Sequence, residues 1–346
     1  MDLKERMLPA PRDGGFRMEG YWVWCGSVIK AENGRYYMFA SRWPKTQNMH
    51  PGWLFQSEIV RASSDNPCGP FQFEEVVIGD RGPQYWDGRM AHNPRIFKHN
   101  NQYILYYTGT TYPFAIEDSE VIQNNDYRTM IARANKRIGI AVADCITGPF
   151  IRRDEPILCT RPDYFDNVLT SNPAPYIEED GSVYMIYKSR SYRGKPYKNP
   201  LHGPMNIGIA KAEHFLKPHC AVLTSPLFDQ SLIEDPFVWK ENGTYHMIAK
   251  DMFGTICGEK HGGVYAASQN GIDWKMKQNY LAYSRTVLWD DQKVEKMGSM
   301  ERPFILFENG EATHMYFATS DGRENGFLDA KNTWNMVIPL KKSSYR

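Results

Sequence analysis

Two short acidic segments of the chain carry carboxyl groups suited to acid–base chemistry. They are Glu-Asp-Pro at 234–236 and Glu-Arg-Pro at 301–303, and each leads into an apolar run. Cleavage of a glycosidic bond needs one carboxylic acid that protonates the leaving oxygen. It also needs a second carboxylate that activates water or attacks the anomeric carbon. The sequence therefore predicts a proton donor at one of these segments, and we assign that role to Glu234.

The neighbours of Glu234 decide whether it holds a proton near neutral pH. Repulsion from Asp235 and Asp251 would raise its pKa, because a nearby negative charge disfavours ionisation of a carboxyl group. Both aspartates are also expected to contact the substrate. The structural alternative is an ion pair between Glu234 and Arg302, which would leave Glu234 without a catalytic role.

Two residues compete for the role of base or nucleophile. Asp87 lies within Tyr-Trp-Asp-Gly-Arg, a segment that we expect in a loop over the site. Its alternative role is an Asx-turn before the following glycine. Glu301 occupies the same position in its segment as the predicted proton donor. Its alternative is an ion pair with a nearby arginine, Arg302 or Arg95.

Further polar side chains at predicted strand ends are expected to bind sugar hydroxyls or a substrate carboxylate, although each taken alone is more often a structural hydrogen-bond partner. They are His92, Asn93, Asn172, Lys188, Lys250, Arg302 and Arg42. Aromatic rings stack on the apolar faces of sugars, and the candidate platforms are Trp24, Trp43, Trp86 and Tyr112. The glycine-rich segment 258–263 contains His261 and would act as a lid. His92 and His261 match no metal-binding spacing, so we expect no obligatory metal and no cofactor.

One pattern recurs five times along the chain and must position these side chains. Each copy has a polar group before Pro or Gly, an apolar run, a polar turn and an aromatic-rich strand. The copies begin near residues 22, 92, 171, 234 and 301. Asn-Gly and Asp-Gly turns supply the positive φ of tight hairpins. The pattern predicts an all-β fold, a five-bladed β-propeller forming one domain over 1–346. A β-sandwich with fortuitous hairpins is the alternative.

The blade pattern also predicts where the site lies. The first strand of each blade starts at the same face of the ring at which the second strand ends, so the polar groups at these ends should share one mouth. The loops 114–136 and 192–205 are long enough to close a pocket there. Residues 1–18 are expected to cross the ring or to add a strand beside 334–338.

At these motifs the chain resembles the five-bladed propeller glycoside hydrolases of families 43, 32, 68 and 117, and bacterial proteins described as sucrase-like. The matching pieces are Trp24-Cys25-Gly26-Ser27, Trp86-Asp87-Gly88, His92-Asn93-Pro94, Glu234-Asp235-Pro236 and Met300-Glu301-Arg302-Pro303. The resemblance covers almost the whole chain through the blade pattern. It implies a glycosidase whose carboxylates meet at the bottom of a central funnel.

The resemblance to family 43 breaks down at two catalytic positions. The family's first inner strand starts with the Asp that acts as general base, and here that position is Cys25. The Asp that tunes the acid in the third blade corresponds to Asn172. Only the acid of the fourth blade is kept, as Glu234. Either the site uses other acids, or the protein is not an ordinary family 43 glycosidase.

Composition excludes several other classes of function. The net charge is +1 and basic runs are missing, so we expect neither nucleic acid nor an anionic membrane as a partner. The charged start of the chain lacks the apolar core of a signal peptide, and the six cysteines lack metal or redox spacing. These features favour a cytoplasmic protein with free thiols.

The function expected from the sequence is an exo-acting glycoside hydrolase that binds a small glycoside or an oligosaccharide. Two alternatives follow from Cys25 and Asn172. One is a propeller that binds carbohydrate without cleaving it. The other is a glycoside phosphorylase in which Arg42, Lys188, Lys250 and Arg302 hold phosphate.

Overall fold

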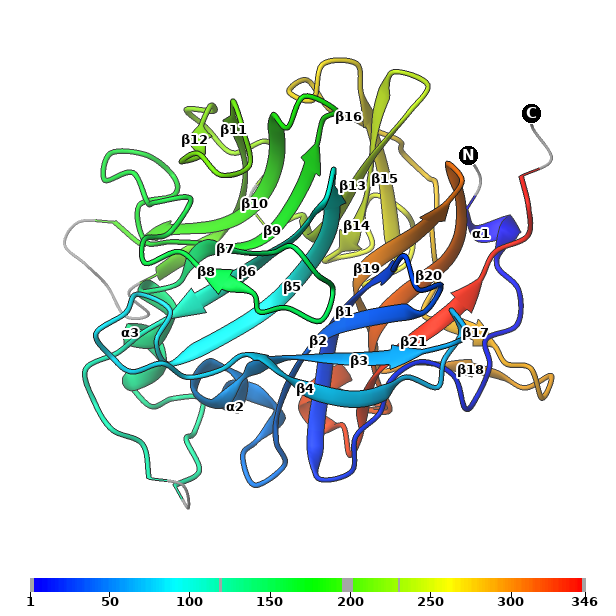
Figure 1. Ribbon diagram of the computed structural model, residues 1–346, viewed down its shortest axis with the longest axis horizontal. Helices are drawn as coiled ribbons and strands as arrows, with labels where there is room; N and C mark the ends of the chain where they lie inside the picture. The colour runs from blue at the N-terminus through cyan, green and yellow to red at the C-terminus, as the bar shows by residue number, and fades with distance from the viewer. Residues whose placement is uncertain (1–2, 118–119, 195–201, 230, 344–346) are drawn as a thin grey trace.

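The computed structural model describes residues 3–117, 120–194, 202–229 and 231–343, and its strands form the five blades expected from the sequence (Figure 1). Five antiparallel sheets follow one another in chain order, and the first strand of each blade contacts the first strands of its two neighbours. The first strands therefore line the axis of the ring. The prediction of an all-β five-bladed propeller is confirmed.

The first four blades are four-stranded meanders, in which each strand pairs with the next along the chain. Blade one comprises β1 (Tyr21–Lys30), β2 (Tyr36–Pro44), β3 (Glu58–Ser64) and β4 (Gln72–Ile78). Blade two comprises β5 (Met90–His99), β6 (Gln102–Thr110), β7 (Arg137–Ala143) and β8 (Ile151–Arg152). Blade three comprises β9 (Leu169–Ile177), β10 (Val183–Tyr192), β11 (His202–Ala212) and β12 (Cys220–Ala221). Blade four comprises β13 (Ile233–Glu241), β14 (Thr244–Asp251), β15 (Gly263–Ser268) and β16 (Lys275–Met276).

Blade five has three strands, and the N-terminal segment completes it. Its strands are β19 (Ser299–Glu308), β20 (Glu311–Ser320) and β21 (Thr333–Pro339). Phe16 exchanges backbone hydrogen bonds of 2.9 and 3.0 Å with Asn335, and Met7 bridges Leu340. The start of the chain thus joins the blade formed by its end, as the sequence predicted, and this pairing closes the ring.

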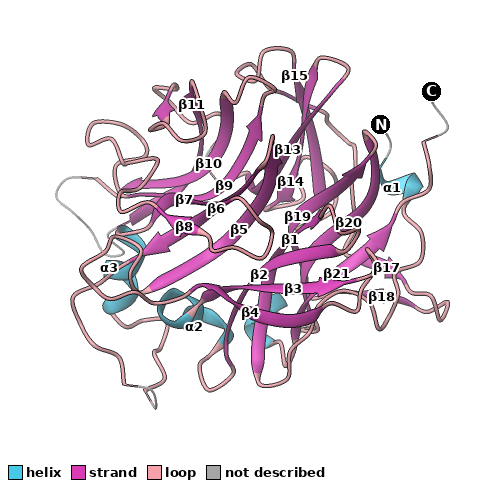
Figure 2. Ribbon diagram, in the orientation of Figure 1, coloured by secondary structure: helices cyan, strands magenta, loops and turns pink. Residues whose placement is uncertain are grey.

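The remaining elements are short and lie outside the blades (Figure 2). They are the helices α1 (Leu3–Arg6), α2 (Met49–Gln56), α3 (Arg128–Ala134) and η1 (Gly326–Asp329), and the hairpin of β17 (Thr286–Leu288) and β18 (Val294–Lys296). The helices α2, α3 and η1 all follow the end of a second strand, at the face where the first strands begin. Within the described ranges, no helix is long and apolar enough to cross a bilayer.

Turn chemistry fixes the hairpins that open the blades. Two-residue loops join β13 to β14 at Asn242-Gly243 and β19 to β20 at Asn309-Gly310, and all four residues have φ between 50° and 77°. Asn and Gly tolerate this left-handed conformation, which matches the twist of the flanking strands. These turns set the register of the first two strands and so place the strand starts at one mouth.

Each first strand is also interrupted by a bulge near its beginning, one residue before the repeated Pro or Gly. The residues at these five positions all have φ between 52° and 58°, and they are Cys25, Asn93, Asn172, Asp235 and Arg302. The pairing register shifts at the same place in every blade. The strands begin one or two residues earlier than the polar motifs suggested, because the bulge lies inside the strand and not at its start. A bulge re-aims side chains, and here it does so five times around the axis.

Closure of the ring by the N-terminal segment predicts an effect on stability. The Phe16 side chain is 1% exposed within the hydrophobic cluster of blade five. Phe16→Ala should lower the free energy of unfolding by about 3–5 kcal/mol in urea, because it leaves a cavity in a closed core. Phe253→Ala is the control, since that side chain is 56% exposed and should change stability little. Equal effects of the two substitutions would contradict the closure.

Candidate functional site

A cavity of about 220 Å³ lies at the mouth where the first strands begin. The first strands of all five blades contribute to its lining, together with α2, α3 and η1. The lining residues are Trp24, Trp43, Met49, His50, Trp53, His92, Asn93, Arg133, Lys136, Leu169, Asn172, Lys188, Arg190, Glu234, Asp235, Glu301, Arg302 and Phe327. The structure therefore brings ten of the predicted site and platform residues together here.

The five bulge residues join their side chains into a belt around the axis. Cys25 Sγ donates to Asn93 Oδ1 at 2.7 Å, and Asn93 Nδ2 donates to Asn172 Oδ1 at 2.6 Å. Asn172 Nδ2 donates to Asp235 Oδ1 at 3.1 Å, and Arg302 Nη1 donates to the same oxygen at 2.7 Å. We call this set the belt. It fixes Asp235 between an amide and a guanidinium, and four of its five members line the cavity.

Glu234 and Glu301 share one buried lysine. Lys250 Nζ lies 2.9 Å from Glu234 Oε2 and 2.9 Å from Glu301 Oε1. Glu234 also accepts a hydrogen bond from Lys188. Neither glutamate forms the alternative ion pair with Arg302, which binds Asp235. The two acids predicted from the repeat position therefore meet in one place, although Lys250 itself lies behind the cavity wall.

The two glutamates differ in their readiness to ionise. Burial alone would raise the pKa of Glu234, but Lys188 and Lys250 outweigh it and hold the pKa well below the usual range. Burial raises the pKa of Glu301, and the charges of Asp235 and Glu234 add to this, while Lys250 opposes it. The prediction that neighbouring carboxylates raise the pKa of Glu234 is therefore wrong. That environment belongs to Glu301, because Glu234 has a second lysine and Glu301 does not.

Aromatic rings and His92 form one wall of the cavity. Trp53 stacks on His92 with ring centroids 4.8 Å apart, and Trp24 meets Phe327 edge to face at 6.0 Å. His92 Nδ1 lies 2.7 Å from Ser57 Oγ, and burial together with Arg302 and Lys136 holds the pKa of the imidazole well below its usual value. His92 is therefore a neutral, fixed group at neutral pH. Trp53 was not predicted, because it lies on α2, outside the blade repeat.

Three cations that sequence reasoning did not single out also line the cavity. Arg133 is on α3, Lys136 precedes β7, and Arg190 lies near the end of β10. The loop 114–136 was expected to close a pocket, and it supplies the first two. Half of the predicted partner loop 192–205, namely residues 195–201, lies outside the described residues. Arg190 could have been predicted from the sequence. It lies near the end of the second strand of blade three, two residues after Lys188, which was predicted from the same position.

Asp87 does not line this cavity, so the structure does not bring it together with Glu234 and Glu301 as the sequence predicted. Its side chain is fully buried between blades, bonded to Arg81 at 2.7 Å and to the Tyr107 hydroxyl at 2.7 Å. Asp166 repeats the arrangement one blade later, with Arg161 at 3.0 Å and the Tyr187 hydroxyl at 2.6 Å. The Arg–Asp–Tyr unit is a structural device that recurs with the blade.

Asp251 and His261 hold loops in place and do not line the cavity. The Asp251 carboxylate accepts hydrogen bonds from four backbone N–H groups of the loop 253–257, at 2.7–3.1 Å. It therefore shapes this loop, and the residue is fully buried. His261 lies in the adjoining glycine-rich loop, and its N–H bonds the Asp251 carbonyl at 2.7 Å. Neither Asp251 nor His261 lines the cavity in which the other predicted binding residues meet.

Three other predicted residues lie elsewhere for identifiable reasons. Arg42 bonds Glu58 at 2.8 Å and packs over Tyr21 and Phe73, because its side chain points outward from β2. Trp86 stacks on Tyr107 within the interface of the Arg–Asp–Tyr unit. Tyr112 donates to the Phe55 carbonyl and is buried beneath α2. None of the three contributes to the cavity.

Nothing in the described ranges gathers three or more His, Cys, Asp or Glu side chains in a way that would hold a metal ion. His92 and His261, the two histidines considered as ligands, lie in different environments. The donor set of the cavity is instead rich in lysine and arginine, which coordinate no metal at neutral pH.

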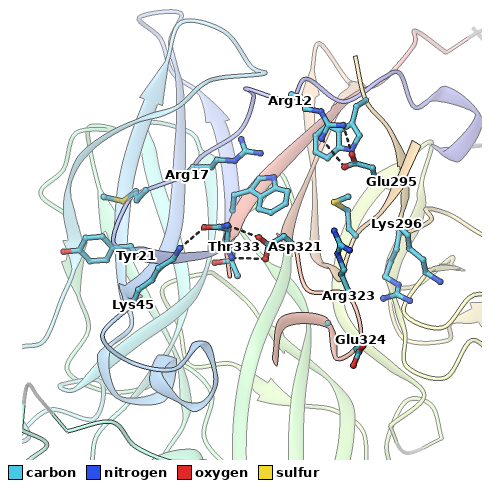
Figure 3. Close-up of a pocket in the computed structure, with 17 residues that line it drawn as sticks. Arg12, Arg17, Tyr21, Lys45, Glu295, Lys296, Asp321, Arg323, Glu324 and Thr333 are labelled. Atoms are coloured by element: carbon cyan, nitrogen blue, oxygen red, sulfur yellow. Dashed lines mark hydrogen bonds and ion pairs between the residues drawn. The ribbon is translucent and has the colours of Figure 1, made fainter. Parts of the chain in front are cut away.

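A larger hollow of about 900 Å³ lies between the N-terminal segment and blade five (Figure 3). Several of its charged side chains already have partners. Arg12 bonds Asp291 and Glu295 at 2.9 Å, and Lys45 donates to Asn332 at 2.9 Å. Asp321 accepts from the backbone of the loop 331–332. These groups hold the surrounding loops together.

Solved structures with this fold include several glycoside hydrolases. Zg3597, a family 117 glycoside hydrolase of the marine bacterium Zobellia galactanivorans, superposes with a TM-score of 0.65 at 15% identity, over 97% of this chain and 89% of that one. A GH43_1 enzyme from Xanthomonas citri gives 0.60 at 15% identity, over 98% and 92%. CoXyl43, a GH43 β-xylosidase/α-arabinofuranosidase from a compost microbial metagenome, gives 0.59 at 16% identity, over 97% and 96%.

These similarities establish the fold of the chain over nearly its whole length. The expected resemblance to propeller glycoside hydrolases of families 43 and 117 is thus confirmed at the level of the fold. No family model matches the sequence, and no curated protein is similar to it. The chemistry of this chain must therefore be argued from its own side chains.

The burial of Asp87 and Asp166 predicts matched losses of stability. Asp87→Asn and Asp166→Asn should each lower the free energy of unfolding by about 1.5–3 kcal/mol, because each removes a charged hydrogen-bond acceptor from a buried arginine contact. Denaturant unfolding measures this. Ligand binding in the cavity should be unchanged in both variants. A loss of activity in Asp87→Asn without a loss of stability would contradict this placement.

Proposed function

We propose that the protein is an exo-acting glycoside hydrolase whose reaction takes place between Glu301 and Glu234. The observation that carries this proposal is the pair itself: two carboxyl groups around one lysine, with pKa values displaced in opposite directions. Two titratable groups with environments that separate their pKa values are the arrangement by which acid and base roles are divided. The fold shared with glycoside hydrolases supports the same assignment.

The roles follow from the protonation states. Glu301, with its raised pKa, donates a proton to the leaving glycosidic oxygen. Glu234 stays ionised and attacks the anomeric carbon, forming a glycosyl ester. Glu301, now a carboxylate, then takes a proton from the water that hydrolyses this ester. These roles reverse the acid assignment made from the sequence, in which Glu234 was the donor.

The spacing of the two groups supports a nucleophilic role for Glu234. Because Lys250 Nζ is 2.9 Å from an oxygen of each, those oxygens are separated by at most twice that distance. Inverting enzymes need about 6.5–9.5 Å between carboxyl groups to admit a water, whereas retaining enzymes have about 5–5.5 Å. The shorter arrangement fits direct attack.

The size and closure of the cavity support exo action. Its volume of about 220 Å³ is below the roughly 300–1,000 Å³ typical of pockets for drug-sized ligands. Side chains of α2, α3 and η1 cover its outer side. Such a cavity accommodates one terminal sugar unit and leaves the leaving group outside.

The two alternatives drawn from the sequence have less support. Of the four cations expected to hold phosphate in a phosphorylase, Arg42 lies outside the cavity, and Lys188 and Lys250 are paired with Glu234. A propeller that only binds sugars would need no pair of carboxyl groups with divergent pKa values.

Substitution of the two glutamates separates their roles. Glu301→Gln should lower kcat by about 10²–10⁴-fold on glycosides with poor leaving groups, and by much less on nitrophenyl glycosides that need no proton. Glu234→Gln should impair both kinds of substrate. Glu308→Gln, on the same strand but at its far end beside Lys30, is the control and should be fully active. If Glu234→Gln instead shows the dependence on leaving group, then Glu234 is the acid after all.

The pH profile tests the same assignment. The acid form of Glu301 is lost as pH rises through its raised pKa, so kcat/KM should fall on the alkaline side. The pKa of Glu234 is held well below the usual value of a glutamate, so Glu234 is already ionised at the pH at which an ordinary glutamate titrates. The profile should therefore show no acid limb in that pH range. In Glu301→Gln the alkaline limb should disappear from the residual activity. An alkaline limb that persists in this variant would assign it to another group.

A further inference from the structure

The cavity holds more positive than negative charge, and the excess lies on one side. Its carboxylates Glu234, Glu301 and Asp235 are all paired, with Lys188, Lys250 and Arg302. Three further cations remain, and we call them the cationic wall: Arg133, Lys136 and Arg190. Within the described residues no carboxylate forms an ion pair with any of them.

Lys136 is a buried member of the cationic wall. The residue is 4% exposed, and no described side chain or carbonyl accepts a hydrogen bond from its ammonium group, which lies 5.2 Å above the Trp53 ring. Burial, followed by repulsion from Lys188, Arg133 and Arg190, holds its pKa well below the usual value. A buried charge without a partner is costly, and burial therefore favours the neutral amine. An anion bound beside Lys136 would reverse this and stabilise the ammonium form.

The two arginines of the wall are held in place without being neutralised. Arg190 Nη1 donates to the Gly203 carbonyl at 2.8 Å, and Arg133 Nη2 lies 3.1 Å from His50 Nε2. Burial and Arg133 lower the pKa of His50 to about 4, so the imidazole brings no negative charge and no positive one. Two oriented guanidinium groups and an ammonium thus face one small space.

We propose that the terminal sugar bound in this cavity carries a carboxylate, as in a uronic acid, and that Arg133, Lys136 and Arg190 bind it. The inference rests on the proposed function only in taking the ligand to be a sugar. Guanidinium groups match the two oxygens of a carboxylate, and a ligand anion would supply the missing charge. Glu234 and Glu301 come from blades four and five, whereas the wall comes from blades two and three, so one sugar can face both.

A free oxyanion such as phosphate offers similar chemistry, but the carboxylate pair argues against it. In an inverting phosphorylase, phosphate takes the place of the second carboxylate. Here both carboxylates are present and adjacent, so no position is left for a phosphate nucleophile. The test therefore includes inorganic phosphate as a separate arm.

The experiment measures binding, which does not require catalysis. Glucuronate and galacturonate are titrated calorimetrically into the wild-type protein, beside glucose, galactose and inorganic phosphate. We expect a uronate to bind roughly 10–100-fold more tightly than its neutral counterpart, as for hydrogen bonds to charged groups. Lys136→Met should abolish this preference and raise Tm, because it removes an uncompensated buried charge. Lys211→Met is the matched control, since Lys211 lies 4.5 Å over the Tyr184 ring, outside the cavity.

Three results would overturn the proposal. The first is equal affinity for neutral sugars and uronates. The second is phosphate binding as tightly as the uronates and competing with them, which would make the wall a free-oxyanion site. The third is a lower Tm in Lys136→Met, which would make this lysine a structural residue. Uronate binding without cleavage of any glycoside would refute the proposed hydrolase and leave this inference standing, and cleavage of neutral glycosides alone would do the opposite.

Discussion

The site depends on a bulge that places one residue of each blade in the left-handed conformation. Outside glycine this conformation costs of order 1–3 kcal/mol per residue and survives only where the surroundings impose it. In this chain the surroundings are the other four bulges, because the belt runs from Cys25 through Asn93 and Asn172 to Asp235, which Arg302 reaches from the far side. The belt ties the blades to one another at the axis and forms the floor of the cavity.

The belt also explains why the catalytic candidates come from blades four and five. Its first three members are neutral, and its last two carry opposite charges that neutralise each other. Asp235 is therefore committed to the belt, and the glutamates beside it are free to pair with lysines. The difference in pKa between Glu234 and Glu301 depends on Lys188, a residue of blade three. Lys188 forms an ion pair with Glu234 and not with Glu301. In the proposed mechanism, a single cation from a neighbouring blade thus decides which glutamate is the acid and which is the nucleophile.

The sequence was sufficient to predict the blade repeat and the features that follow from it directly. The blades, the Asn-Gly hairpins and the mouth at which strands begin all follow from patterns a few residues long. The internal repeat also indicated a structural role for Asp87, because the pair Arg81 and Asp87 is repeated as Arg161 and Asp166 before the next blade. A residue that recurs at the same position of successive blades has a structural role in the blade. Asp251 gave no comparable signal, because its role depends on the path of the loop 253–257.

The pKa order of the glutamates and the cationic wall were beyond the reach of the sequence for a physical reason. Electrostatic environment depends on distances between blades, and neither Lys188 beside Glu234 nor Lys136 beside Trp53 is close in the chain. Once these distances are known, the two sides of the cavity differ: Glu234 and Glu301 lie on one side, and the cationic wall lies on the other. A sugar with one negative group gains most when that group faces blades two and three, and this places its anomeric carbon toward Glu234. In the proposed reaction, the cationic wall would therefore select the orientation in which the glycosidic bond faces Glu234 and Glu301.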